Sequence, residues 1–166
     1  MKVWQLKGNA MTVDRRSLFA LTGLMLSAIL VAGCSGMTGQ QAGKREHRLV
    51  VHVDDNDPAK MNLALNNVSN VYAYYLEKNE PVEVEVVAYG PGLHMFRDDT
   101  SPVKKRLEAL KQTYDGVVFS ACGNTMQGMA RAEGKPVKLA SDVQVVPAGV
   151  TRIMELQERG WSYLRP

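Results

Sequence analysis

Short apolar runs alternate with segments of helical periodicity along most of this chain, and this alternation limits the fold more than any other feature. Because strands separated by helices pair in parallel through right-handed crossovers, the pattern predicts an α/β domain. We expect a three-layer, doubly wound, mainly parallel sheet of about five strands with helices on both faces. The runs that read as strands are rich in β-branched residues and cover 48–53, 82–89, 116–121, 143–146 and 161–164.

Helical segments fill the gaps between these runs. Asp57 and Pro58 are typical of a helix N-terminus, and apolar residues at three- and four-residue spacing follow to about Asn79. Ser101 and Pro102 predict the start of a second helix. The last two helices are expected over 124–132 and 148–159, each ended by a glycine.

Two of the strands differ in character. The run 116–121 is the most apolar and predicts a central strand. In 82–89, Glu83 and Glu85 alternate with valines, which predicts one exposed face, as on an edge strand. The segment 90–99, which follows, reads as a long connecting loop.

In parallel α/β sheets, ligands gather outside the carboxyl ends of the strands. Three segments of this chain leave that edge, namely 54–57, 90–99 and 122–125. The topology therefore predicts that these three segments converge, and that a functional site is built from them.

Cys122 is the strongest candidate for chemistry at this edge. It directly precedes a predicted helix, where backbone N–H groups and the helix dipole favour a thiolate. Gly123, Asn124 and Thr125 would supply donors that hold an anionic sulfur species or another small anion. The structural alternative is a buried, inert cysteine, with Asn124 or Thr125 acting only as a helix cap.

Other polar residues at this edge carry weaker signals. His94 could reach the thiol as an acid, a base or a pocket wall, although a loop histidine is more often simply exposed. His52 lies inside the first strand and is expected to be packed. The acidic residues of the first loop suit capping and turns better than a metal, because they lack the spacing and distal glutamate of an EF-hand. These residues are Asp54, Asp55 and Asp57.

The sequence predicts neither a metal site nor a cofactor. Met95, Met126 and Met129 would suit Cu(I) together with an imidazole, but their spacing matches no metal motif and the last two fit one packed helix face. The chain has no dinucleotide-binding glycine signature, no P-loop and no Ser-His-Asp signature. Cofactor-dependent enzymes and ordinary hydrolases are therefore disfavoured.

Residues 1–33 read as an export signal. Four basic residues precede the apolar stretch 18–32, which is roughly 15 residues long and so shorter than the ~20 that a membrane-spanning helix needs. Arg15 and Arg16 give the segment a twin-arginine character. Small residues then lead to Cys34, as in a bacterial lipoprotein box, so that cleavage would leave Cys34 as the lipid-bearing N-terminus.

The residues after the signal complete the predicted domain organisation. The segment 34–46 is small and polar and reads as a flexible tether, which leaves 47–166 as the folded domain. We therefore predict an exported protein on the periplasmic side, anchored in the membrane through lipid on Cys34; a plain signal or membrane anchor is the alternative. With Cys34 lipidated, Cys122 would be a lone thiol outside the cytoplasm.

The net positive charge of the chain comes from the predicted export signal, residues 1–33. The whole sequence has 20 basic and 17 acidic residues and a formal net charge of +3. Four of the basic residues and one of the acidic residues fall within 1–33, so the remaining 16 of each kind balance. Nucleic-acid binding needs a basic patch or stripe, so no nucleic-acid partner is predicted.

Several motifs spread over 47–165 together resemble the DsrE/DsrF-like sulfur-relay family. The most specific is Phe119-Ser-Ala-Cys-Gly-Asn-Thr-Met126. The others are His52-Val-Asp-Asp-Asn-Asp-Pro58, Asn62-Leu-Ala-Leu-Asn-Asn67, Val86-Val-Ala-Tyr-Gly-Pro-Gly-Leu93, Pro147-Ala-Gly-Val150 and Gly160-Trp-Ser-Tyr163. The resemblance implies a small α/β domain that assembles as a homo-oligomer, either a trimer or a hexamer. It also implies a persulfide on Cys122 and a partner protein that donates or accepts sulfur.

The residues and the resemblance together favour reversible persulfide formation at Cys122, in a carrier rather than a turnover catalyst. Two alternatives stay open at this point. In the first, the strand-end pocket binds a small ligand and Cys122 only lines it. In the second, the protein is an oligomeric structural lipoprotein whose thiol is inert.

Overall fold

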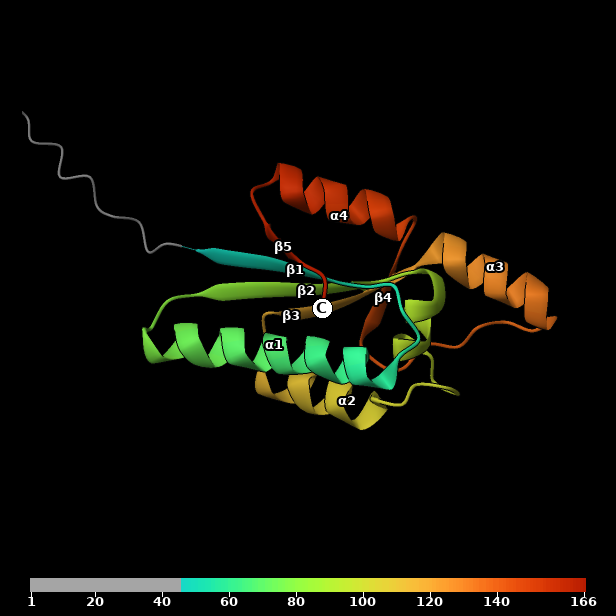
Figure 1. Cartoon of the computed structure of the whole chain (residues 1–166), viewed down its shortest axis with the longest axis horizontal. Coiled ribbons are helices and arrows are strands. Elements are labelled where there is room, and N and C mark those ends of the chain that lie inside the picture. Colours follow the sequence, from blue (N-terminus) through green and yellow to red (C-terminus); the bar gives the residue numbers. More distant parts are fainter. Residues whose placement is uncertain (1–45) are drawn as a thin grey trace, which may run out of the picture. The chain divides into compact units, whose positions relative to one another are not determined.

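The computed structural model describes residues 46–166, which form a single parallel sheet with helices on both faces (Figure 1). This confirms the predicted three-layer α/β fold. The sheet has five strands in the order β4-β3-β2-β1-β5, and each neighbouring pair is parallel. The strands are β1 (His47–Val53), β2 (Val82–Ala88), β3 (Val117–Cys122), β4 (Val143–Val146) and β5 (Ser162–Leu164).

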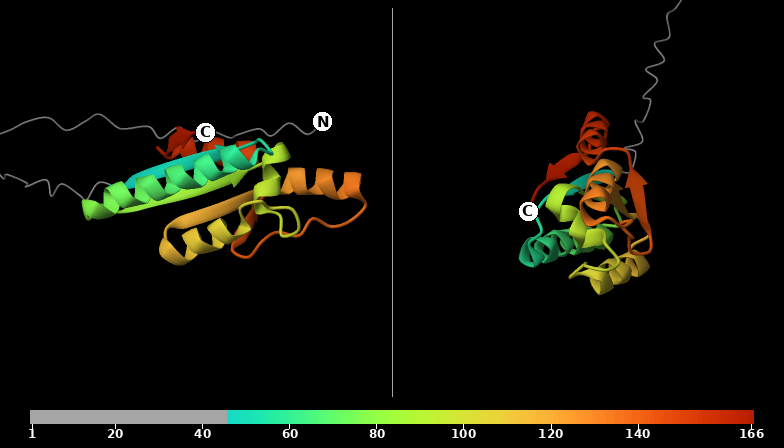
Figure 2. Two further views of the ribbon diagram at one scale, coloured as in Figure 1. Left: turned by 60° about the horizontal axis from the view of Figure 1, so that its bottom comes forward. Right: turned by 90° about the vertical axis from the view of Figure 1, so that its right-hand side faces the viewer.

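Four α-helices and one 3₁₀ helix of the described range connect the strands. Figure 1 shows α1 and α2 on one face of the sheet and α4 on the other, and the end-on view in Figure 2 shows the same separation. The helices are α1 (Pro58–Glu77), η1 (Gly90–Phe96), α2 (Lys104–Thr113), α3 (Gly123–Glu133) and α4 (Gly149–Glu158).

The predicted export signal over 1–33 and the lipidation site Cys34 lie outside the described residues, as does all of the predicted tether except Glu46. Among residues 46–166, no helix combines the length and the apolar character that crossing a bilayer requires.

The main hydrophobic core lies between the sheet and the pair α1 and α2. Alternate strand residues such as Val51, Val86 and Phe119 face it and are almost fully buried. The opposite face has a smaller core, in which Ile153 and Leu156 of α4 pack against the sheet. Full burial of each such side chain contributes roughly 1.5–3 kcal/mol to the free energy of folding. The cores on both faces therefore stabilise the sheet and hold the strand ends in place.

The first helix begins where the sequence predicted. Asp57 is the N-cap, and its side chain accepts a 2.8 Å hydrogen bond from the Ala59 N–H. Pro58 follows as the first helical residue, where its missing N–H costs nothing. The apolar face of α1 then buries Met61 and Leu65 against the sheet.

The prediction that 82–89 forms an edge strand is wrong, because β2 is the middle strand of the sheet, with β3 and β1 on its two sides. The alternation of charge and valine had suggested an exposed face. Instead, Glu85 is only 2% exposed and pairs with Arg152 of α4. A partner distant in sequence therefore makes burial of this carboxylate possible. The strand 116–121 is also interior, as predicted, but stands beside the middle strand.

The prediction of an irregular loop over 90–99 is also wrong in its first part, because η1 occupies Gly90–Phe96. Gly92 is needed here, since a Cβ at this position would lie 2.2 Å from the carbonyl oxygen of Val53. That close approach seats Leu93 and Phe96 in the core. A periodicity based on 3.6 residues does not detect a helix of this type.

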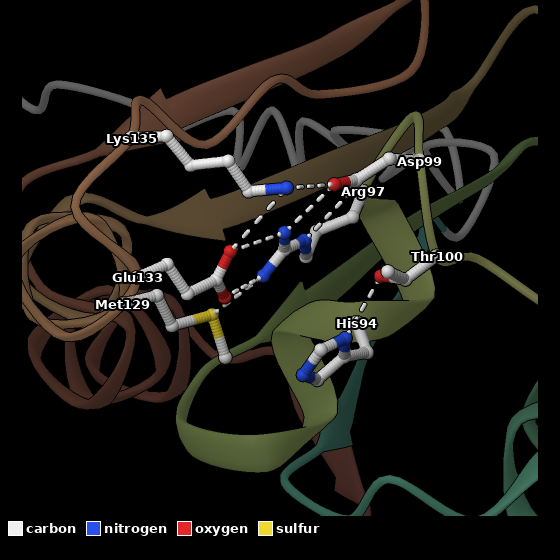
Figure 3. A network of polar contacts seen from close by, with 7 residues as sticks. All are labelled: His94, Arg97, Asp99, Thr100, Met129, Glu133 and Lys135. Atoms are coloured by element: carbon white, nitrogen blue, oxygen red, sulfur yellow. Dashed lines mark hydrogen bonds and ion pairs between the residues drawn. The ribbon is translucent and has the colours of Figure 1, made fainter.

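Arg97 fixes the end of η1. Arg97 is 1% exposed, and its guanidinium lies between the carboxylates of Asp99 and Glu133, with Nη2 at 2.9 and 2.8 Å from their oxygens (Figure 3). Lys135 adds a 3.3 Å contact to Asp99. The cluster ties the segment after β2 to the carboxyl end of α3.

Candidate functional site

Cys122 is the last residue of β3 and the N-cap of α3. The helix begins at Gly123, one residue earlier than predicted, so neither Asn124 nor Thr125 is the N-cap. Within the described structure, no side chain caps this N-terminus. The first turn of α3 therefore lies beside the thiol, and Cys122 is 5% exposed.

A second helix N-terminus reaches the same thiol. Cys122 pairs in register with Val146 of β4, so the chain that enters α4 passes beside it. A Cβ on Gly149, the first residue of α4, would lie 3.3 Å from the Cβ of Cys122. The Asn124 N–H donates to the Pro147 carbonyl at 3.2 Å and joins the two helix starts. The amino ends of α3 and α4 thus converge on one sulfur.

This arrangement favours the thiolate. Burial raises the pKa of the Cys122 thiol, but hydrogen bonds from the Thr125 side chain and from the N–H groups of Gly149, Thr125 and Asn124 outweigh it and leave the pKa below its ordinary value. Hydrogen bonds to the charged form of a group lower its pKa in this way. The Asn124 N–H is shared with Pro147, so Gly149 and Thr125 supply the unshared donors.

Thr125 also joins the thiol to the neighbouring strand end. Its hydroxyl oxygen accepts a 3.0 Å hydrogen bond from the Gly90 N–H at the start of η1. A Cβ on Gly90 would in turn lie 3.9 Å from the carbonyl oxygen of Asp54, which follows β1. The structure therefore brings together the three segments that the topology predicted to converge, with Gly90 between the other two.

An aromatic cluster that was not predicted from the sequence lies next to this site. The His52 ring stacks on Tyr89 with centroids 4.5 Å apart, and its Nδ1 lies 2.7 Å from the Tyr163 hydroxyl. Tyr89 lies against α4, since a Cβ on Gly149 would be 2.8 Å from the Tyr89 ring. In the sequence, Tyr89 directly follows β2 and Tyr163 lies in the Gly160-Trp-Ser-Tyr163 motif, far from His52.

His52 is packed, as predicted, with 5% of its surface exposed. Burial lowers the pKa of His52, while the carboxylate of Asp54 raises it and Arg165 lowers it further. Its Nε2 is buried without a hydrogen-bond partner in the described structure and lies 3.8 Å from an Asp54 oxygen. The lowered pKa therefore favours the neutral imidazole at pH 7.

His94 has a different set of contacts from those predicted for a group acting on the thiol. Its Nδ1 lies 2.8 Å from the Thr100 hydroxyl, and Figure 3 shows the ring turned towards Thr100. The contacts of Cys122 come instead from α3 and α4. The structure thus gives His94, which lies in η1, a partner in the segment that follows this helix.

The acidic residues of the first loop are each engaged in local contacts. Asp57 caps α1 and Asp55 pairs with Lys60 at 2.5 Å. Asp54 accepts two hydrogen bonds from Arg165, at 3.0 and 2.8 Å. Capping and ion pairing are therefore the roles that the geometry gives these carboxylates.

The three methionines belong to the packing of the domain. Met95 is fully buried in the main core, while Met126 and Met129 pack against its surface. The Met129 sulfur lies 3.9 Å from Nη1 of Arg97. Figure 3 draws this contact. Within residues 46–166, no three His, Cys, Asp or Glu side chains form a group suited to a metal ion.

The comparisons with known proteins place the domain in a family. The model of the DsrE/DsrF-like family matches residues 48–166, which is most of the chain. The chain belongs to the DsrE/DsrF-like family. The family match includes both helix starts that meet at Cys122.

One solved structure is similar to this chain in both sequence and fold. It is a protein of unknown function from Methanobacterium thermoautotrophicum, with 37% sequence identity and a TM-score of 0.62. The alignment covers 72% of this chain and 99% of the archaeal one. No curated protein matches the sequence significantly.

Proposed function

We propose that this protein is a sulfur carrier that holds sulfane sulfur as a persulfide on Cys122. The observation that carries the proposal is the convergence of two helix amino ends and the Thr125 hydroxyl on a single thiol. Donors of this kind lower a thiol pKa, and a thiolate is the form that attacks sulfur. Membership of the DsrE/DsrF-like family supports a sulfur-relay type of domain.

The loading step is a displacement at sulfur. The Cys122 thiolate attacks the terminal sulfur of a polysulfide, and a new S–S bond forms on Cys122. The adjacent S–S bond of the donor breaks, and the shortened polysulfide leaves as an anion. Because only 5% of Cys122 is exposed, a slender chain end fits this approach better than a bulky donor.

The unloading step reverses the roles. A thiolate on the acceptor attacks the outer sulfur of the persulfide, and Cys122 departs as a thiolate. The N–H groups of Gly149 and Thr125 favour this departure, because a leaving thiol of low pKa leaves faster. The same donors therefore assist loading and unloading, as a reversible carrier requires.

The pH dependence of alkylation and the intact mass of the protein test this proposal. We expect an apparent thiol pKa clearly below the ~8.5 of a free cysteine. After exposure to polysulfide, the protein should gain the mass of one sulfur atom, and Cys122→Ser should not. A slow-reacting thiol without this adduct would overturn the proposal and favour a ligand-binding or assembly role.

We propose further that the carrier is exported, anchored by lipid on Cys34, and assembled as a trimer or hexamer. The support is the sequence of the leader and the resemblance described above. The full-length protein should partition into the detergent phase of a membrane extract, and Cys34→Ala should not. Light scattering of the purified protein gives the oligomer number, and a monomer would contradict the assembly.

A further inference from the structure

A buried ion pair joins α4 to the middle strand. Glu85 of β2 is 2% exposed, and its two carboxylate oxygens accept hydrogen bonds from Arg152 Nε at 2.8 Å and Nη2 at 2.7 Å. The Ser120 hydroxyl donates to the same carboxylate at 2.6 Å, and Gln144 donates to Ser120 at 2.9 Å. Side chains from β2, β3, β4 and α4 therefore form one connected network.

Stability alone is a weak explanation for this pair. The same face of β2 also carries Val87, which packs against Ile153 and Leu156 of α4, so an apolar residue could fill the Glu85 position. Removing two charges from water offsets most of their attraction. A two-bonded arginine–carboxylate pair does supply a fixed geometry, and it sets where the first turns of α4 sit on the sheet.

The network lies close to the thiol along α4. Arg152 is three residues after Gly149, and its N–H donates to the Ala148 carbonyl at 3.0 Å, in the first turn of the helix. A shift of Arg152 therefore moves Gly149 with it. Hydrogen-bond strength falls steeply with distance and angle, so a small displacement of this turn weakens the contact between Gly149 and the sulfur.

We propose that Glu85 and Arg152 are a positioning pair, which holds the first turn of α4 on β2 and so keeps the Gly149 N–H directed at the Cys122 sulfur. The pair acts through the helix and not by contact with substrate. Its biological meaning rests on the proposed carrier function, but its structural effect is measured on the thiol itself.

The test is the pH dependence of Cys122 alkylation in two variants of the full-length protein. Arg152→Lys keeps the charge and loses the two-bonded geometry. Glu85→Gln removes a negative charge, which by direct electrostatics would lower the thiol pKa. Loss of positioning raises it instead. We expect both variants to raise the apparent pKa by about half a unit to one unit, which cuts the thiolate fraction roughly three- to tenfold at a pH well below the pKa.

Arg106→Lys is the matched control. Arg106 lies on α2, on the other face of the sheet, and binds Asn62 and Asn66 of α1 at 2.5 and 2.7 Å. This variant makes the same substitution at an arginine whose partners are uncharged amide oxygens of a neighbouring helix, and it should leave the thiol pKa unchanged. An unchanged pKa in both test variants, or a lower pKa in Glu85→Gln, would overturn the positioning role.

Amide hydrogen exchange of the unmodified protein gives a second test that does not depend on variant folding. The Gly149 N–H should exchange slowly, because it is held by the sulfur. Exchange at the rate of a free amide would overturn the inference. Failure of the carrier proposal is recognised separately, as absence of the sulfur adduct in the unmodified protein even though its thiol pKa is low.

Discussion

Gly149 and Cys122 are packed so closely that a Cβ on the glycine would lie 3.3 Å from the Cβ of the cysteine. The same Cβ would lie 2.8 Å from the Tyr89 ring, which is closer than real side chains approach. The absence of a side chain at residue 149 therefore lets the amino end of α4 come within hydrogen-bonding reach of the thiol.

Gly149→Ala should consequently lower both stability and thiol reactivity. Overpacking of this kind costs typically about 1–3 kcal/mol, and the displaced helix should raise the Cys122 pKa. Urea unfolding and alkylation rates measure the two effects. Gly128→Ala is the control, because nothing lies within 4 Å of a Cβ there; it lies within α3 and should stabilise the protein by roughly 0.5–1 kcal/mol.

The Thr125 hydroxyl makes two hydrogen bonds, and two substitutions can distinguish their effect from that of side-chain packing. Its hydroxyl donates to the thiolate and accepts from the Gly90 N–H. Thr125→Val removes both hydrogen bonds and should raise the Cys122 pKa, with a loss of stability of about 1–3 kcal/mol from the unpaired N–H. Thr125→Ser keeps the hydroxyl and should behave like the unmodified protein. Equal alkylation profiles for the two variants would rule out the Thr125 contribution.

Local patterns in the sequence were enough to predict the layers of the fold. The apolar run before Cys122 and the helix after it place the thiol at a strand end, and parallel topology places three loops at that edge. Asp57 with Pro58 fixed the start of α1. These features depend on residues that are neighbours in sequence, so a period or a capping pattern reveals them.

Features that depend on distant partners could not be predicted in the same way. Glu85 resembled an exposed residue because its partner Arg152 lies 67 positions away. The contact between Gly149 and Cys122 depends on the register of β3 with β4, and strand order does not follow from periodicity. The glycine in Pro147-Ala-Gly-Val150 was visible, but only the fold gives it a role.

His52 should make the stability of the domain depend on pH. Burial lowers the pKa of His52 below its ordinary value of 6.5 in the folded state, so the unfolded chain binds the proton more readily. The contribution of His52 to the free energy of unfolding is therefore fully present above its pKa in the unfolded chain, which is about 6.5. It falls as the pH drops from 6.5 through the pKa of His52 in the folded protein. Urea unfolding over this range should show the loss, and His52→Gln should remove it. An NMR titration of His52 with a midpoint above 6.5 would contradict the prediction.

The Arg97 cluster should determine how the stability of the domain changes at low pH. Hydrogen bonds from Arg97 lower the pKa of Asp99 and of Glu133 below their ordinary values of 3.8 and 4.5. The pKa values of Asp99 and Glu133 are lower in the folded protein than in the unfolded chain. The resulting stabilisation is therefore present above the pKa values of the unfolded chain, and it is lost as the pH falls through the pKa values of the folded protein. Thermal unfolding should therefore show a falling midpoint below about pH 4.

Glu133→Gln tests which residues cause this acid response. The substitution removes one of the two carboxylates that neutralise the buried guanidinium of Arg97, so the unfolding temperature should fall at neutral pH and depend less on acid. Asp98→Asn breaks the exposed pair with Lys104 and serves as the control, since such pairs contribute little. If the two variants unfold alike at neutral pH, the Arg97 cluster does not hold η1 to α3.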